Sequence, residues 1–323
     1  METEFSKSLG IRAPLICGAM YPCSNPELVA AVSEAGGIGI VQPLSLTYVY
    51  GYDFREGLRY IRSLTRRPIG VNLIIEQSSR KYLERVRRWL AISLEEGIPF
   101  FVTALGDPRW VVDEARRRDT LVYHDVTERR FAQKAADAGV DGFICVNNRA
   151  GGHAGKLSPE ELLHEVSDFG KPMICAGGIG SPEQFRAALA MGYDGAQLGT
   201  RFIATTECRA PDDYKQAILA AQASDIVLTE KISGVPVSVI KTPWLEKTGT
   251  HAGPLARWML KGRKTKRWMR TIYAWQSIFK LRNAMRQGMT HKDYYQAGKS
   301  VDGIHNIEPA GKIVSEFTQA LDC

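Results

Sequence analysis

Eight short and almost wholly apolar runs, separated by stretches with helical periodicity, constrain the fold of this chain more than any other feature. The runs cover residues 14–19, 38–42, 69–75, 99–105, 121–126, 142–148, 172–178 and 195–202. Strands without polar alternation are typical of parallel sheets covered by helices on both faces. Such repeats indicate an α/β fold, either a closed barrel or a large doubly wound sheet. The count of eight favours a (β/α)8 TIM barrel.

The stretches between these runs carry signals for the ends of helices. Asn25 precedes a proline and a glutamate, as an N-cap precedes a first helical turn. Ser158 and Ser181 are each followed by proline, and Glu161 and Gln184 stand three residues further on, which is the capping-box pattern. We therefore expect a helix after most of the apolar runs.

The strand–helix rhythm ends near residue 202. Residues 211–221 look helical, 226–241 look extended, 253–289 look like basic helices, and 309–321 look helical again. A single barrel needs about 250 residues, so this chain of 323 residues has room for an appended, mainly helical basic segment. We expect a barrel core over 1–210, a helical and extended insertion over 211–296 that forms a small substrate-side subdomain, and a C-terminal helix over 297–323 that returns to the barrel.

The composition favours a cytoplasmic protein. The N-terminus lacks the apolar core of a signal peptide, and no run of about 18 apolar residues is present. None of the six cysteines forms a C-x-x-C pair, so reduced thiols are favoured over a disulfide framework or a zinc site. We expect no metal centre.

The net charge of +7 is concentrated in one segment, because residues 247–292 contain no Asp or Glu. The part 257–286 interleaves Lys and Arg with Trp258, Trp268 and Trp275, a composition compatible with docking to a membrane or an acidic partner. Charge runs are more often solvated faces, and we favour that interpretation, with the tryptophans in a local core. Nucleic-acid binding is not expected. The exposed helices of a barrel are also compatible with a homodimer.

Small residues end the seventh and eighth runs, where barrel enzymes often bind phosphate. Gly177 and Gly178 follow the seventh run, and Gly199 and Thr200 lie in the eighth. Backbone amides at such positions, with a helix N-terminus behind them, suit an anion. The alternative is that these glycines only form tight turns. Two such sites at the last two strands favour a phosphate site over that alternative.

A glycine-rich loop after the sixth run carries His153, at the end of the barrel where chemistry is expected. An imidazole there can donate, accept or transfer a proton near neutral pH. A surface histidine in a flexible loop is the alternative. His124 and Asp125, near the end of the fifth run, suit either a second catalytic pair or a hydrogen-bonded pair at the barrel rim.

With these residues identified, the chain resembles the nitronate monooxygenase family, formerly called 2-nitropropane dioxygenases. The resemblance covers the chain from its start to about residue 242 and again about 297–317. The stretches 150–155 (AGGHAG), 176–179 (AGGI) and 192–208 (GYDGAQLGTRFIATTEC) carry it most specifically, and 26–39 and 70–73 also match.

The resemblance implies an FMN-dependent barrel enzyme. It implies His153 as the catalytic residue at the reactive edge of the flavin, and it repeats the assignment of the phosphate to the ends of strands seven and eight. The cofactor-binding residues expected from the motifs and the resemblance together are Gly18, Ala19, Met20, Asn72, Gly177, Gly178, Gly199 and Thr200.

The chain also departs from the family pattern on the side expected for the substrate. Many members have Glu or a small residue where Arg149 stands, Gln or another polar residue where Val146 stands, and some have Lys where Asp125 stands. These departures leave the expected phosphate site unchanged, so they bear on the substrate more than on the cofactor.

The leading hypothesis for the function is oxidation of an alkyl nitronate with O2, which gives nitrite and a carbonyl compound. FMN would carry the redox chemistry. The alternative is reduction of FMN by NAD(P)H, followed by reduction of an enoyl thioester of acyl-carrier protein or CoA, or of a quinone. Acyl carriers and CoA are acidic, so the basic segment is compatible with this alternative.

Overall fold

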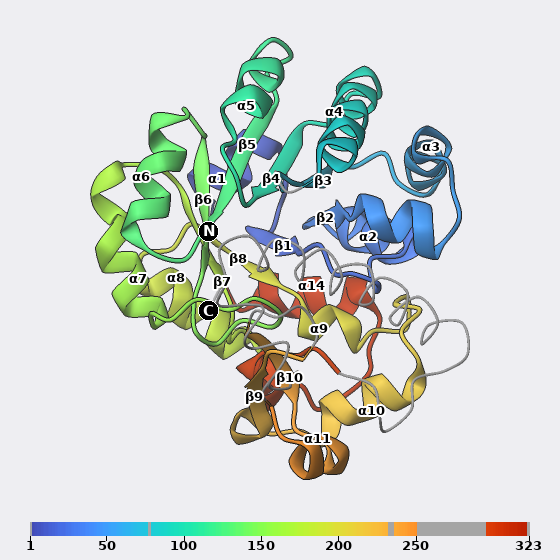
Figure 1. The fold of residues 1–323 in the computed structure, drawn as a ribbon, viewed down its shortest axis with the longest axis vertical. Coiled ribbons are helices and arrows are strands. Elements are labelled where there is room, and N and C mark those ends of the chain that lie inside the picture. Colours follow the sequence, from blue (N-terminus) through green and yellow to red (C-terminus); the bar gives the residue numbers. More distant parts are fainter. Residues whose placement is uncertain (1, 77–78, 232–235, 251–294, 322–323) are drawn as a thin grey trace.

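The computed structural model describes residues 2–76, 79–231, 236–250 and 295–321. Its centre is a closed barrel of parallel strands in sequence order, with β1 pairing β8 (Figure 1). The strands are β1 (Leu15–Cys17), β2 (Ile38–Val41), β3 (Ile69–Ile74), β4 (Phe100–Ala104), β5 (Leu121–Val126), β6 (Gly142–Val146), β7 (Met173–Ala176) and β8 (Gly195–Leu198). Each strand lies within one of the eight apolar runs. The predicted TIM barrel is therefore confirmed.

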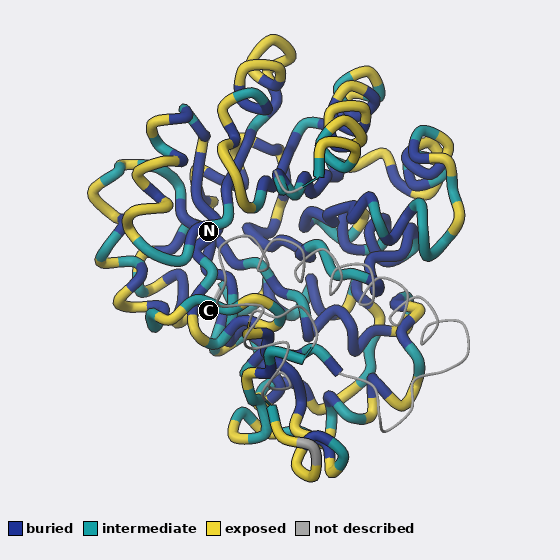
Figure 2. Tube along the Cα trace, viewed as in Figure 1, coloured by how far each residue is buried: buried dark blue, intermediate teal, exposed yellow. Residues whose placement is uncertain are grey.

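Helices surround the barrel, as expected for strands buried on both faces (Figures 1 and 2). α7 and α8 begin with the capping boxes expected at Ser158 and Ser181. α14 packs against α2 and α8, which places the C-terminal helix between the first and last helices of the ring. The helices of this ring are α2 (Pro26–Glu34), α3 (Phe54–Leu64), α4 (Arg80–Glu95), α5 (Arg109–Arg116), α6 (Arg129–Asp137), α7 (Pro159–Val166), α8 (Pro182–Met191) and α14 (Ala310–Gln319).

The barrel interior has its own apolar cluster, distinct from the layer between strands and helices. Phe5 of α1 (Glu4–Leu9) belongs to this cluster and stacks in tilted geometry with Phe100 and Tyr123. Ile16 and Ile144 also belong to the cluster. These residues establish which side chains of each strand face inward, because successive strand residues face opposite sides.

After β8 the chain forms the short helix α9 (Thr200–Ile203), then α10 (Asp212–Ala220) and an antiparallel pair of strands, β9 (Ile226–Thr229) and β10 (Val237–Ile240). α11 (Pro243–Thr248) follows, and Figure 1 shows it beside the hairpin at the end of the molecule away from α4 and α5. The expected basic helices over 253–289 lie outside the described residues. The proposed domain boundaries at 210 and 296 stay a prediction.

None of the described helices is both long and apolar enough to cross a membrane. Within the described ranges, no three His, Cys, Asp or Glu side chains come together in a way that suits a metal ion. Five cysteines, all but Cys323, are buried and free.

Candidate active site

The loop after β7 is shaped by its contact with the loop after β6. Gly177 and Gly178 have φ angles of +124° and +80°, which favour glycine. A methyl group on Gly177 would lie 2.5 Å from both the Ala150 nitrogen and Asn147 Oδ1. The Asn147 side chain also donates to the Gly177 carbonyl at 3.1 Å. The need for a tight turn therefore explains why residue 177 is a glycine. It does not explain the direction of the Gly178 amide.

Backbone amides at the ends of β7 and β8 point to no partner in the described part of the chain. This holds for Gly178 and Gly199, neither of which donates a hydrogen bond to another described residue. Gln184 accepts from the amides of Gly180 and Ser181 at 2.7 and 3.2 Å, so the start of α8 is satisfied internally. Gly178 and Gly199 are among the residues that the sequence assigns to a phosphate, and within the described residues their amides are free to donate to one.

Thr200 connects the end of β8 with the segment before α14. Its hydroxyl oxygen accepts from the Gly298 amide at 3.0 Å, and its side chain is buried. A methyl group on Gly298 would lie 2.6 Å from the Gly151 nitrogen, so the backbone of the loop after β6 passes directly over this segment. Three loops and the segment around 298 therefore meet beside the expected phosphate site.

Arg149 brings a positive charge to the same place. A methyl group on Gly178 would lie 2.9 Å from the Cβ, Cδ and Nε atoms of Arg149, so this side chain lies along the turn after β7. Its backbone is fixed as well, because its amide donates to Asn147 Oδ1 at 2.8 Å and its carbonyl accepts from the Lys299 amide at 2.9 Å. Arg149 is half-buried, and its side chain lies beside the candidate anion site.

The residues expected along the flavin ring lie at the carboxyl ends of β1 and β3. Gly18 follows β1 and donates its amide to the Leu198 carbonyl at 2.9 Å. Ala19 and Met20 continue from it, and the Met20 sulfur lies 3.6 Å from the position of a methyl group on Gly199. Asn72 is 7% exposed and donates to the Val102 carbonyl at 3.2 Å. Met20 is thus next to the candidate phosphate site, while Asn72 stands on the opposite half of the barrel.

His153 lies in a loop whose backbone is held on both sides. The Gly152 carbonyl accepts from the Ser238 amide of β10 at 2.8 Å, and Gly155 donates to the Asn147 carbonyl at 3.1 Å. A methyl group on Gly155 would lie 2.3 Å from the Val146 carbonyl oxygen. The His153 side chain is exposed, at the carboxyl end of the barrel where the sequence expects it.

His124 and Asp125 do not form a pair, because adjacent strand residues point to opposite faces. The His124 Nδ1 atom lies 2.8 Å from the Thr103 hydroxyl, and the imidazole is 5% exposed. Burial lowers the pKa of His124 to about 4, so the ring is neutral at physiological pH. Asp125 pairs in register with Ile144, an interior residue, and therefore faces the inside of the barrel.

Two polar side chains on the inner wall of the barrel have a buried oxygen without a hydrogen-bond partner among the described residues. They are Asp125 Oδ1 and Gln197 Oε1. Gln197 pairs with the interior residue Ile16, and its Cγ lies 2.9 Å from the position of a methyl group on Gly18. Burial raises the pKa of Asp125 to about 7. The sequence suggests Asp125 both as a partner of His124 and as a departure from the family pattern. Sequence reasoning missed Gln197, although the alternation of inward and outward residues along β8 was a usable signal.

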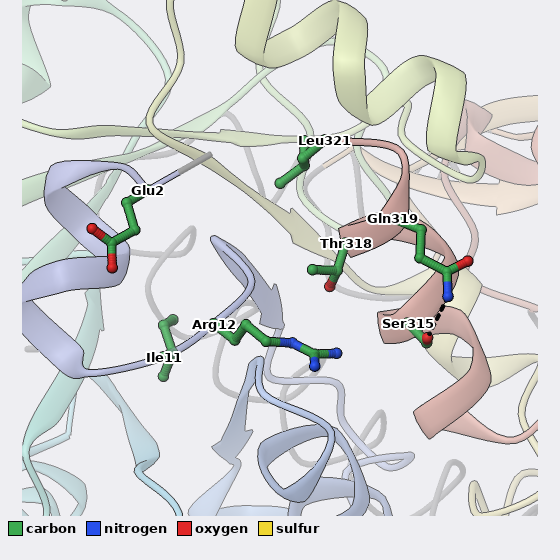
Figure 3. Close-up of a pocket in the computed structure, with 7 residues that line it drawn as sticks. All are labelled: Glu2, Ile11, Arg12, Ser315, Thr318, Gln319 and Leu321. Atoms are coloured by element: carbon green, nitrogen blue, oxygen red, sulfur yellow. Dashed lines mark hydrogen bonds between the residues drawn. The ribbon is translucent and has the colours of Figure 1, made fainter. Parts of the chain in front are cut away.

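A cavity of about 410 Å³ lies at the opposite end of the barrel (Figure 3). Ile11 and Arg12, which precede β1, line it together with Ser315, Thr318 and Gln319 of α14. Barrel enzymes place their chemistry beyond the carboxyl ends of the strands, so this cavity lies outside the candidate active site.

Comparison with known proteins agrees with the fold and the motifs. The family model described as nitronate monooxygenase matches residues 2–320. The chain belongs to the nitronate monooxygenase family. Its members and relatives are flavin-dependent oxidoreductases, and the chain is accordingly a flavin-dependent oxidoreductase in this general sense.

Individual relatives differ in what their names describe. The chain is 25% identical to a (3aS,4S,5R,7aS)-5-hydroxy-7a-methyl-1-oxo-octahydro-1H-indene-4-carboxyl-CoA dehydrogenase of Rhodococcus jostii, over 95% of this chain and 92% of that protein. It is 27% identical to a probable nitronate monooxygenase of Staphylococcus saprophyticus, over 78% of this chain and 82% of that protein. The structure of FabK from Thermotoga maritima superposes with a TM-score of 0.81 at 27% identity, covering 100% of this chain and 96% of that one.

Proposed function

We propose that this protein binds FMN and uses it to oxidise or reduce the carbon–carbon bond next to the carbonyl of an acyl thioester. The FMN phosphate would accept hydrogen bonds from the amides of Gly178, Gly199 and Thr200, with the Arg149 guanidinium as counter-charge. Donors without a partner beside a cation suit a phosphate dianion. The residues present therefore fit the phosphate end of FMN.

The inner wall of the barrel fits the ring end. Isoalloxazine carries both hydrogen-bond donors and acceptors on its pyrimidine edge, so it can meet the unpaired oxygens of Asp125 and Gln197. Buried polar atoms without partners are rare in native proteins, and a ligand is one way to satisfy them. Gly18 and Ala19 would line the space for the ring without bulky side chains. Asn72 would present its side-chain amide to the same space.

The carboxyl group of Asp125 is the observation that favours a thioester over a nitronate. A nitronate carries a full negative charge on its reacting group, and the ionised form of Asp125 places a second negative charge on the inner wall of the same barrel, so the two repel each other. The reacting carbons of a bound acyl thioester are neutral, so this repulsion is absent from the bound substrate. The relative from Rhodococcus jostii, whose name describes a carboxyl-CoA dehydrogenase, supports the same substrate class.

The roles of the residues follow from their positions. When bound, FMN supplies hydride transfer to or from the substrate. His153 would donate a hydrogen bond to the thioester carbonyl oxygen, which favours negative charge on that oxygen and eases loss or gain of the proton at the α-carbon. The two backbone contacts that flank His153 hold it in place.

Anaerobic titration of the FMN-loaded protein tests the proposal. We expect a saturated acyl-CoA alone to bleach the oxidised flavin, or an α,β-unsaturated acyl-CoA to reoxidise flavin that NADH or NADPH has first reduced. His153→Gln should slow the acyl-CoA step by about 10²–10⁴-fold and leave FMN affinity unchanged. His164→Gln, at an exposed position of α7, is the matched control and should have no effect.

Nitronate oxidation is the second candidate, since the family model and the Staphylococcus saprophyticus relative both carry that name. It predicts that a nitronate alone reduces the flavin anaerobically and that nitrite appears when O2 is admitted. That result, combined with no spectral response to acyl-CoA or NAD(P)H, would replace the thioester proposal. A protein that binds no FMN at all would refute both.

A further inference from the structure

Asp125 is the one acidic side chain that the described strands direct into the barrel interior. It stands next to last in β5, two residues beyond the interior residue Tyr123 and in register with Ile144. Its Oδ1 atom is buried without a hydrogen-bond partner in the described ranges. A carboxylate in such a place is destabilising unless something else pairs with it.

The neighbouring strands offer nothing to pair with it. β4 (Phe100–Ala104) and β6 (Gly142–Val146) contain no charged residue. Cys145 and His124 are titratable groups near it that point to the outer face of the barrel; burial raises the pKa of the Cys145 thiol well above its usual value, and His124 is bonded to Thr103. Tyr123 shares the inner face with Asp125, and burial raises the pKa of its phenol, so it stays neutral.

Groups beyond the strand ends complete the surroundings. The loop after β6 brings Arg149, His153 and Lys156 to the same end of the barrel, and Asp107 follows β4. Burial is the physical cause of the raised pKa of Asp125. The space that Asp125 faces is the one in which the proposed flavin ring lies.

We propose that Asp125 contacts the flavin ring and takes up a proton when the ring is reduced. This inference rests on FMN as the cofactor and is independent of the substrate. Two electrons and one proton, bound at N5, convert the oxidised ring into a form with one additional negative charge. That charge beside a carboxylate is unfavourable, so the Asp125 carboxylate forms an O–H bond with a proton from solvent. Reduction would then consume two protons for two electrons.

The test counts protons during reduction of the FMN-loaded enzyme. Anaerobic titration with dithionite at pH 8, read as the pH dependence of the midpoint potential, gives the number of protons per two electrons. We expect about two for the wild type and about one for Asp125→Asn, because the amide cannot take up a proton. Asp125→Glu should restore a value above one. Asp137→Asn, at an exposed position of α6, should behave as the wild type.

The outcomes separate this inference from the proposed function. Failure to bind FMN would refute the cofactor itself. A wild-type value of about one proton, or equal values of two for wild type and Asp125→Asn, would overturn the role of Asp125 while FMN remained the cofactor. If Asp125→Asn does not fold, the wild-type count and the Asp125→Glu variant still decide the question.

Discussion

The unpaired carboxyl group of Asp125 makes a quantitative prediction for the cofactor-free protein. Its pKa is raised from 3.8 to about 7 by burial, so the native state holds this proton more tightly than the unfolded chain. The associated stability is complete below pH 3.8 and is lost as the pH rises to 7. Each pKa unit corresponds to about 1.4 kcal/mol. Between pH 5 and pH 8, Asp125 therefore removes about 3 kcal/mol from the free energy of unfolding.

Asp125→Asn removes this pH dependence. The amide left in place carries its own cost of about 1–3 kcal/mol if it has no partner, but that cost does not depend on pH. The quantity to compare is therefore the change in stability between pH 5 and pH 8, and not the stability at one pH.

Thermal unfolding of the cofactor-free proteins measures the difference. An unfolding entropy of about 2.1 cal/mol/K per residue gives about 0.7 kcal/mol/K for 323 residues, so 3 kcal/mol corresponds to about 4 °C. Between pH 5 and pH 8, the Tm of the wild type should fall by about 4 °C more than the Tm of Asp125→Asn. The Tm of Asp137→Asn should change as that of the wild type does. Parallel melting curves for wild type and Asp125→Asn would refute the assignment of Asp125 as a buried, unpaired carboxyl.

Three further predictions concern neighbouring residues. Burial lowers the pKa of His124 to about 4, so the free energy of unfolding of the wild type should fall by up to about 3 kcal/mol because of this residue between pH 6.5 and pH 4. Unfolding of His124→Gln measured at both pH values should lack this decrease. Arg149→Gln should weaken binding of FMN about tenfold and leave binding of riboflavin, which has no phosphate, unchanged in a fluorescence titration; equal losses would exclude a phosphate contact. Gly177→Ala should lower thermal stability and FMN affinity together, since the new methyl group meets the backbone of Ala150 at 2.5 Å and the φ angle is +124°; a native-like Tm would contradict this.

The fold could be predicted because its signals are local. Each strand of the barrel is a short apolar run, and the capping residues Ser158 and Ser181 begin α7 and α8 as their spacing requires. β5 coincides with its run, and the other barrel strands are one to four residues shorter than theirs. At β8 the run 195–202 includes α9, because apolar composition does not distinguish a buried strand from a buried helix of four residues.

The site was only partly predictable. Strand ends and glycines identified the loops, but the contact between Arg149 and Gly178 joins two loops and has no sequence signature. The opposite directions of His124 and Asp125 were available from strand periodicity alone. What no sequence pattern reveals is whether a buried polar atom has a partner. Asp125 Oδ1 and Gln197 Oε1 become informative only once the inner wall of the barrel is closed around them.

The loss of stability caused by burying Asp125 and its proposed proton uptake on flavin reduction both follow from the free energy of protonating this carboxyl group. If reduction of the flavin raises the pKa of Asp125, then protonation of Asp125 must strengthen binding of the reduced flavin by the same factor, because linkage is reciprocal. A carboxyl whose pKa is already about 7 in the empty barrel is poised for this, since a change of charge on the ring converts it between its two forms near neutral pH. A surface aspartate would remain ionised throughout and would couple to nothing. The burial that destabilises the cofactor-free protein is thus the property that allows Asp125 to respond to the charge of the flavin.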